Sequence, residues 1–262
     1  MKARTVVFSV PKRGNTVQEW EDGAAGSPGV TANGGDPRYI VVDGATEAYD
    51  SVRWVDHLVS SFVGAEAPEL TRESMRRWFI LMQELWEAKA PARASYIEER
   101  KFEQGSFATL LGCELTGLAG PRPTWRAAAL GDTVIFHVRD GQLLTHFPKL
   151  EANDFGFNPD GVHTSPAHLD NMVHKLEFAG GELIADDLLF LATDAFAQWM
   201  IRFLQDDGQK LWHVLSRLNH PLFFERLVND QRDAGMMKDD DVTLLRVHLA
   251  RNTPVFLMVC LS

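Results

Sequence analysis

Acidic residues stand at the ends of several strongly apolar segments, and this pattern constrains the fold more than any other feature. Aspartates end the segments Ile40–Asp43 and Leu191–Asp194, another follows Ala129–Gly131, and the run Asp239–Asp241 precedes Val242–Val247. Segments this apolar are expected to form buried strands, and the ends of antiparallel strands meet at one edge of a sheet. Carboxylates that converge there repel one another unless a cation or shared protons neutralise them. We therefore expect a metal site at this edge.

The candidate ligands are oxygen atoms, and this chemistry indicates the kind of metal. Carboxylates select hard ions such as Mg²⁺ or Mn²⁺, whereas zinc sites usually contain His or Cys, and the sequence has no HExxH or CxxC motif. His168 and His174 are six residues apart, which does not place them on one helical face, so we expect them on the surface or in a loop. A single aspartate after a strand is usually a turn former or helix cap, so the prediction depends on the combination.

Hydrophobic periodicity in the first part of the chain predicts one loop, one strand and a pair of helices. Residues 22–37 are rich in Gly, Ala and Pro and predict a loop or hairpin tip, and Arg38–Val42 predicts a strand. Apolar residues then recur at helical spacing over Trp54–Val63, and again from about Thr71 to a break at Pro91. A polar helical stretch is expected at Tyr96–Glu103.

The rest of the chain begins with strands and continues with helices. Gly105–Gly117 and Thr124–Phe147 predict successive strands with a tight turn at Asp140-Gly141, and residues 150–166 predict a long loop where substrate contacts are expected. Further strands are expected at Leu188–Thr193, Val242–Leu249 and Pro254–Leu261, and helices at Ala195–Leu204, Gln209–Leu218 and Pro221–Arg232. Without a regular βαβ alternation, this order predicts α+β layers with the sheets inside.

Length and composition predict one cytoplasmic domain that spans residues 1–262. The chain is 45% hydrophobic and 24% charged, which is ordinary for a globular protein. It has 26 Lys and Arg against 36 Asp and Glu, without a dense basic cluster, so we expect no nucleic-acid partner. Cys113 and Cys260 are too few for a disulfide framework. The longest apolar run, Val255–Leu261, is too short to span a bilayer, so we expect no membrane segment.

Six motifs follow one another along nearly the whole chain. They are WEDG at 20–23, VVDGAT at 41–46, GSFATLL at 105–111, ALGDTVIFHVRDG at 129–141, LLFLATDA at 188–195 and DDDVTLLRV at 239–247. In this order they resemble the motifs of the PPM/PP2C family of metal-dependent protein phosphatases. The resemblance implies an α+β fold, a four-layer α-β-β-α sandwich in which helices flank two mainly antiparallel sheets. It also implies hydrolysis of phosphoserine or phosphothreonine by a water activated between two Mg²⁺ or Mn²⁺ ions, with a third, weaker metal position.

The same resemblance implies roles for individual residues. Asp43 corresponds to the carboxylate that bridges both metals, and Gly44 to the residue whose backbone carbonyl binds one of them. Asp194 and Asp240 correspond to the ligands that complete the other ion. Catalysis by such a site is mainly electrostatic, so the three aspartates are the predicted catalytic set.

Further correspondences are weaker. Glu21 and Asp22 match an early acidic pair that supports the site through water, and Asp132 matches the position of the additional metal. The family usually carries a phosphate-binding Arg shortly before the acidic pair, but other residues stand there in this chain, which leaves Arg13 or Lys12 as candidates. Many members carry a His directly after the first Asp-Gly, and this chain does not, so no general acid is assigned.

Three functions are open at this point. The first is a Ser/Thr protein phosphatase that acts on a phosphoprotein and opposes a Ser/Thr kinase, and the second is a pseudophosphatase that serves as a regulatory binding module. Hydrolysis of small phosphoesters is the third, and substrate profiling would separate it from the first. The retained carboxylates favour an enzyme, because a scaffold has no use for mutually repelling acids at strand ends.

Overall fold

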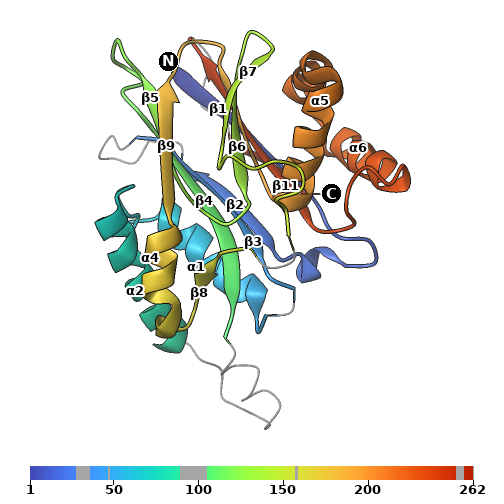
Figure 1. Cartoon of the computed structure of the whole chain (residues 1–262). Coiled ribbons are helices and arrows are strands. Elements are labelled where there is room, and N and C mark those ends of the chain that lie inside the picture. Colours follow the sequence, from blue (N-terminus) through green and yellow to red (C-terminus); the bar gives the residue numbers. More distant parts are fainter. Residues whose placement is uncertain (28–35, 47, 89–104, 157–158, 252–256, 262) are drawn as a thin grey trace.

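The structure is a computed structural model that describes residues 1–27, 36–46, 48–88, 105–156, 159–251 and 257–261. Two mainly antiparallel sheets lie face to face, and helices cover the outer face of each (Figure 1). The four-layer α-β-β-α sandwich expected from the motifs is therefore confirmed. Among the described residues, no helix combines the length and hydropathy needed to cross a membrane.

The first sheet joins the two ends of the chain. Its strands, in spatial order, are β12 (Leu257–Leu261), β1 (Lys2–Val10), β11 (Val242–Ala250), β10 (Leu188–Ala192), β6 (Val134–Arg139) and β7 (Gln142–Phe147). All neighbours are antiparallel except β1 and β12. The helices α5 (Asp194–Arg217) and α6 (Pro221–Asp233) cover its outer face.

The second sheet is formed by the middle of the chain. Its order is β2 (Asp22–Ser27), β3 (Arg38–Gly44), β4 (Phe107–Thr116), β5 (Thr124–Leu130) and β9 (Glu177–Glu182), and the short β8 (Val162–His163) also pairs with β4. Its outer face is covered by α1 (Ser51–Val63), α2 (Arg72–Ala88) and α4 (Leu169–Lys175). The 3₁₀ turns η1 (Val17–Glu19) and η2 (Pro166–His168) complete the described elements.

Three hydrophobic cores separate the four layers, which explains why the strands are apolar on both faces. In β11, Leu244 packs against α5 and α6, whereas Leu245 packs between the two sheets. In β3, Val42 packs under α1 and Val41 points to the other sheet. Because successive side chains of a strand point to opposite faces, both registers of each central strand must be apolar.

Local sequence signals predicted several elements correctly. The helix α1 and the strand β3 lie where the periodicity placed them, and α6 matches the predicted helix from Pro221. The hairpin turn at Asp140-Gly141 is also confirmed. Both of its residues have positive φ, 50° and 70°, as a two-residue turn of the type that joins twisted strands requires.

Two predictions were wrong. Residues 22–27 form the strand β2 rather than a loop, because α1 packs so closely that only small residues fit: a Cβ on Gly23 would lie 2.4 Å from Val55 Cγ1. The two helices predicted over Ala195–Leu218 are one helix, α5. A glycine inside a helix costs only about 1 kcal/mol, and burial of Leu211 and Trp212 beyond Gly208 outweighs that cost.

Other elements were not predicted. The strands β1, β8 and β9 and the helix α4 were absent from the expectation, and β8 lies within the loop expected at 150–166. The strand β1 lies inside the first sheet, between β12 and β11, because its partners come from the other end of the chain. The polar helix expected at Tyr96–Glu103 lies outside the described residues.

A buried polar network joins the two sheets at one place. Trp125 of β5 donates its indole N–H to His137 Nδ1 of β6 at 3.2 Å, which leaves His137 Nε2 to donate to Asp187 Oδ2 at 3.0 Å. Arg139 binds both carboxylate oxygens of Asp187 at 2.8 Å, and the backbone N–H of Ile184 also donates to it. Burial alone would raise the pKa of Asp187, but these hydrogen bonds outweigh it, and the pKa is lowered.

We expect Asp187→Ala to lower the free energy of unfolding by about 3 kcal/mol near neutral pH, because it leaves buried donors unpaired around a side chain that is 0% exposed. The folded-state pKa lies below the unfolded value, so the stability that the ionised group contributes is present above about pH 4 and lost as the pH falls. Urea denaturation near neutral pH and below about pH 4 measures the free energy of unfolding of both proteins.

The control for that experiment is Asp170→Ala, whose side chain is 91% exposed in an ion pair with Arg76. It should change the free energy of unfolding by less than about 0.5 kcal/mol. Equal effects of the two substitutions would contradict a structural role for the Asp187 network.

Candidate functional site

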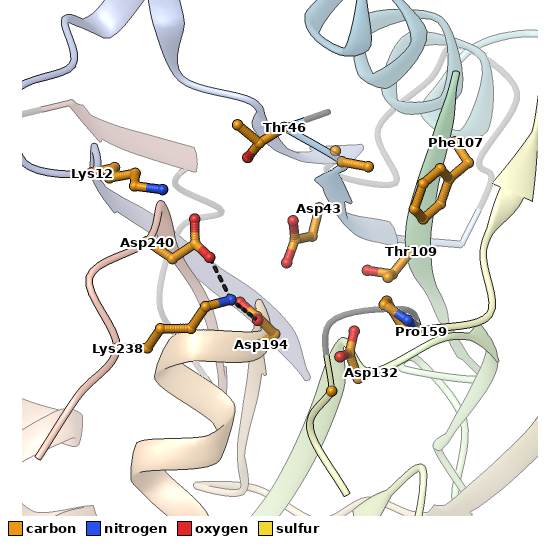
Figure 2. A pocket seen from close by; sticks show the side chains of 13 residues that line it. Lys12, Asp43, Thr46, Phe107, Thr109, Asp132, Pro159, Asp194, Lys238 and Asp240 are labelled. Carbon is orange, nitrogen blue, oxygen red and sulfur yellow. Dashed lines mark hydrogen bonds and ion pairs between the residues drawn. The ribbon is translucent and has the colours of Figure 1, made fainter. Parts of the chain in front are cut away.

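Four aspartates line one cavity of about 310 Å³ at the end of the sandwich where strands from both sheets terminate. Asp43 lies near the end of β3 in the second sheet, and Asp132 lies in the turn that connects β5 of the second sheet to β6 of the first. Asp194 is the first residue of α5, directly after β10, and Asp240 lies on the loop that leads into β11. Figure 2 shows the four side chains around the cavity. The remaining lining residues are Lys12, Gly44, Ala45, Thr46, Phe107, Thr109, Gly156, Pro159 and Lys238.

Two glycines fix the backbone beside Asp43 and Asp132. A Cβ on Gly44 would lie 2.6 Å from the Glu21 carbonyl oxygen, and the Gly44 N–H donates to that oxygen at 3.1 Å. Gly131 has a φ of +108°, and a Cβ there would lie 2.5 Å from the carbonyl oxygen of Asp160. Any other residue at either position would displace the neighbouring aspartate.

Asp22 does not line the cavity but holds the two sheets together behind it. It stands opposite Asp43 in the pairing of β2 with β3, within the second sheet. Its Oδ2 accepts hydrogen bonds from the hydroxyls of Thr193 at 3.0 Å and Thr243 at 2.8 Å. Thr193 directly follows β10, and Thr243 belongs to β11, so both lie on the side of the first sheet. Asp22 is therefore a buried link between the sheets, one layer below the cavity.

Asp241 has a similar supporting position. Its two carboxylate oxygens accept from the backbone N–H groups of Lys12 and Glu21, each at 2.7 Å, so it ties two N-terminal loops to the start of β11. The Glu21 carboxylate itself accepts a hydrogen bond from the Ser51 hydroxyl at the start of α1. Glu21 and Asp241 thus hold neighbouring segments of the chain in place, but neither residue lines the cavity.

The aspartates carry more negative charge than their surroundings compensate. Burial and the charges of Asp22 and Asp194 raise the pKa of Asp43 well above its ordinary value. Burial and the Asp194 charge raise the pKa of Asp132 to about 7. The Oδ1 atom of Asp132, a residue only 5% exposed, has no hydrogen-bond partner among the described residues. Buried carboxylates in this state favour binding of a cation.

A lysine already lies among these carboxylates. Lys238 Nζ contacts Asp240 Oδ2 at 2.5 Å and Asp194 Oδ2 at 3.2 Å, and Figure 2 shows it between the two side chains. Asp194 also accepts from the Ala195 N–H at the start of α5, where the helix dipole stabilises a negative charge. In the part of the chain that the structure describes, no group of three His, Cys, Asp or Glu side chains is arranged to hold a metal ion.

The donor chemistry nevertheless fits Mg²⁺ or Mn²⁺. Asp43, Asp132, Asp194 and Asp240 present carboxylate oxygens from both sheets to one cavity, and oxygen ligands are those that both ions prefer. The unpaired Oδ1 of Asp132 faces no competing donor among the described residues. These four residues, with the backbone of Gly44, would hold the ions.

The structure brings some of the predicted site residues together and places others apart. Asp43, Gly44, Asp132, Asp194, Asp240 and Lys12 line the cavity, whereas Glu21 and Asp22 are not among its lining residues. Arg13 points elsewhere: its guanidinium pairs with Asp233 at 2.5 Å and donates to the Asn229 carbonyl at 3.3 Å. Of the two phosphate-binding candidates, only Lys12 therefore reaches the cavity.

Sequence reasoning missed three residues of the site. Lys238 stands two positions before Asp240, so a basic residue beside an acidic run was the available signal. Thr109 pairs with Asp43 across β3 and β4, and its hydroxyl is hydrogen-bonded to Thr133 at 2.7 Å. Phe107 has no local signal, because only the fold turns its side chain toward the aspartates (Figure 2).

Comparison with known proteins supports the architecture. No protein-family model matches the chain, and no curated protein matches its sequence. Solved structures do match: the catalytic domain of the serine/threonine phosphatase PstP in complex with two manganese ions is 14% identical with a TM-score of 0.57, over 95% of this chain and 99% of that one.

Two further structures agree. The serine/threonine phosphatase of S. agalactiae is 17% identical with a TM-score of 0.58, over 94% of this chain and 99% of that chain. The Mycobacterium tuberculosis phosphatase PstP/Ppp is 14% identical with a TM-score of 0.55, over 96% and 100%. The chain therefore has the α+β fold of the PPM/PP2C-type serine/threonine phosphatases.

Proposed function

We propose that this protein is a Mg²⁺- or Mn²⁺-dependent serine/threonine protein phosphatase whose substrate is a phosphoprotein. The observation that carries the proposal is the convergence of Asp43, Asp132, Asp194 and Asp240 on one cavity. The manganese ions of the similar PstP structure support the choice of cofactor. Bound ions would activate water for attack on phosphorus and neutralise the phosphoryl oxygens.

The chain's own residues hold and orient the reacting groups. Asp43 reaches the cavity from the second sheet, Asp132 from the turn between the sheets, and Asp194 and Asp240 from the side of the first. The sandwich therefore fixes their spacing. Lys12 lines the same cavity and would attract a phosphate oxygen, in the role that the family gives to an arginine. No histidine is among the described residues that line the cavity, and we assign no general acid.

The wall near Phe107 suits a protein substrate. The Phe107 ring stacks on the His163 ring with 5.1 Å between ring centroids, and His163 stacks on His168 with 4.1 Å between centroids. These three rings form an aromatic row that begins at the cavity. Such a surface would support the chain beside a phosphoserine or phosphothreonine. Gly156 and Pro159, on the loop predicted to contact substrate, lie at the same cavity.

One observation favours a second candidate, a pseudophosphatase that acts as a regulatory module. The ion pairs of Lys238 with Asp194 and Asp240 partly neutralise two predicted ligands without any metal. We prefer the enzyme because Asp132 Oδ1 remains unpaired, and a binding module gains nothing from an uncompensated buried carboxylate.

Hydrolysis of p-nitrophenyl phosphate should need Mg²⁺ or Mn²⁺, stop in EDTA, and fall by at least about 10³-fold in Asp43→Asn, since one ligand is lost from a site that works electrostatically. Asp170→Asn is the matched control and should keep full activity, because Asp170 is exposed on α4. A higher kcat/KM for phosphopeptides than for p-nitrophenyl phosphate would support a protein substrate. An inactive, folded protein with every metal would favour the pseudophosphatase.

Lys12→Met should raise KM by about tenfold and leave metal dependence intact, because it removes one cation that would bind the phosphate. Arg13→Met, one residue away, should leave KM within about twofold, because Arg13 pairs with Asp233 outside the cavity. Steady-state kinetics with a phosphopeptide compares the two. The reverse order of effects would return the phosphate-binding role to Arg13.

In the metal-free protein, the free energy of unfolding should fall as the pH rises. The pKa of Asp132 is about 7 in the folded protein, above its unfolded value near 4, so folded chains hold a proton that unfolded chains release in this interval. The free energy of unfolding therefore falls across it, by about 1 kcal/mol per pH unit. Urea denaturation in EDTA at about pH 5, 6 and 7 measures the slope. Asp132→Asn should make the slope less steep, although the raised pKa of Asp43 still contributes to it. An unchanged slope would assign the effect to other groups.

A further inference from the structure

Lys238 lies where the structure would otherwise leave two carboxylates without a cation. Its Nζ is 2.5 Å from Asp240 Oδ2 and 3.2 Å from Asp194 Oδ2, so one ammonium bridges two residues from different elements (Figure 2). The bridge is thus a strong, charge-assisted contact.

A metal ion and this ammonium cannot bind the same pair of oxygens together. Mg²⁺ and similar ions contact carboxylate oxygens at about 2.1 Å, so an ion shared by Asp194 and Asp240 would lie where Nζ now lies. Two cations that close would also repel each other strongly in a partly buried site. Binding of a metal to this pair therefore requires Lys238 to leave.

The surroundings give Lys238 room to leave. It lies on the loop between α6 and β11, where Gly235 has a φ of +68°, and its side chain is 41% exposed. A second cavity of about 330 Å³ lies beside the first and is also lined by Lys238 and Asp194. Rotation of the side chain into this second cavity would free the carboxylates without movement of a strand.

We propose that Lys238 is an internal competitor for divalent metal at the Asp194–Asp240 pair. It holds this half of the site together in the metal-free protein, and metal binds the pair only by displacing it. The remaining charge still favours metal, because Asp132 Oδ1 has no partner among the described residues and is not neutralised by this contact. Lys238 thereby raises the metal concentration at which the site fills. The inference depends on the metal site of the proposed function.

The test is Mn²⁺ binding to the full chain, measured by titration calorimetry and by electron paramagnetic resonance of free Mn²⁺. Lys238→Met removes the charge and keeps much of the side-chain length. Of the two Mn²⁺ ions, this variant should bind the less tightly held one at least about tenfold more tightly than the natural protein does. Lys238→Arg keeps a cation and should stay within about threefold of the natural protein. Lys2→Met, on the exposed opposite end of β1, is the control and should change nothing.

Thermal unfolding gives a second measure that does not depend on activity. In EDTA, Lys238→Met should unfold at a lower temperature than the natural protein. Saturating Mn²⁺ should raise the unfolding temperature of Lys238→Met by more than it raises that of the natural protein. Equal or weaker Mn²⁺ binding by folded Lys238→Met would overturn the competition. If neither protein binds Mn²⁺, the metal-dependent phosphatase proposal fails as well, so the two failures are distinguishable.

Discussion

Repulsion between carboxylates held at the meeting point of two sheets is the constraint on which the site depends. Asp43 belongs to the second sheet, Asp132 lies in the turn that connects the two sheets, and Asp194 and Asp240 adjoin strands of the first. Both sheets are covered by helices, so strand ends cannot spread apart without exposing one of three hydrophobic cores. Packing thereby holds together groups that electrostatic repulsion would separate. A bound cation would relieve this repulsion, so the site favours cation binding.

The chain compensates part of this charge by itself, in two different ways. Asp22 and Asp241 accept hydrogen bonds from threonine hydroxyls and backbone N–H groups, which makes them links between the sheets and loops. Lys238 instead offers a positive charge from the same loop that carries Asp240. The contacts of Asp22 and Asp241 are buried or partly buried, whereas the Lys238 side chain is 41% exposed and its ion pairs are more easily exchanged.

Another buried polar network makes the contrast clear. Asp187 is enclosed as completely as any residue of the cavity, yet the hydrogen bonds from Arg139 and His137 lower its pKa rather than raise it. The difference is one of partners, since burial alone raises the pKa of both Asp187 and Asp132. A satisfied aspartate stabilises the sandwich, and an unsatisfied one is free to bind a ligand.

The sequence by itself determined the elements that have local signals, and it singled out the four aspartates that line the cavity. Helical periodicity located α1 and α6, the Asp140-Gly141 turn defined its hairpin, and the order of the motifs indicated the four layers. These succeed because the burial of a helix face and the φ angles of a turn depend on neighbouring residues. Only the tertiary structure decided that residues 22–27 pair as β2 and that β1 lies between β11 and β12. It alone divided the acids into cavity residues and links, and brought Lys238 between Asp194 and Asp240, because those contacts join residues far apart in the chain.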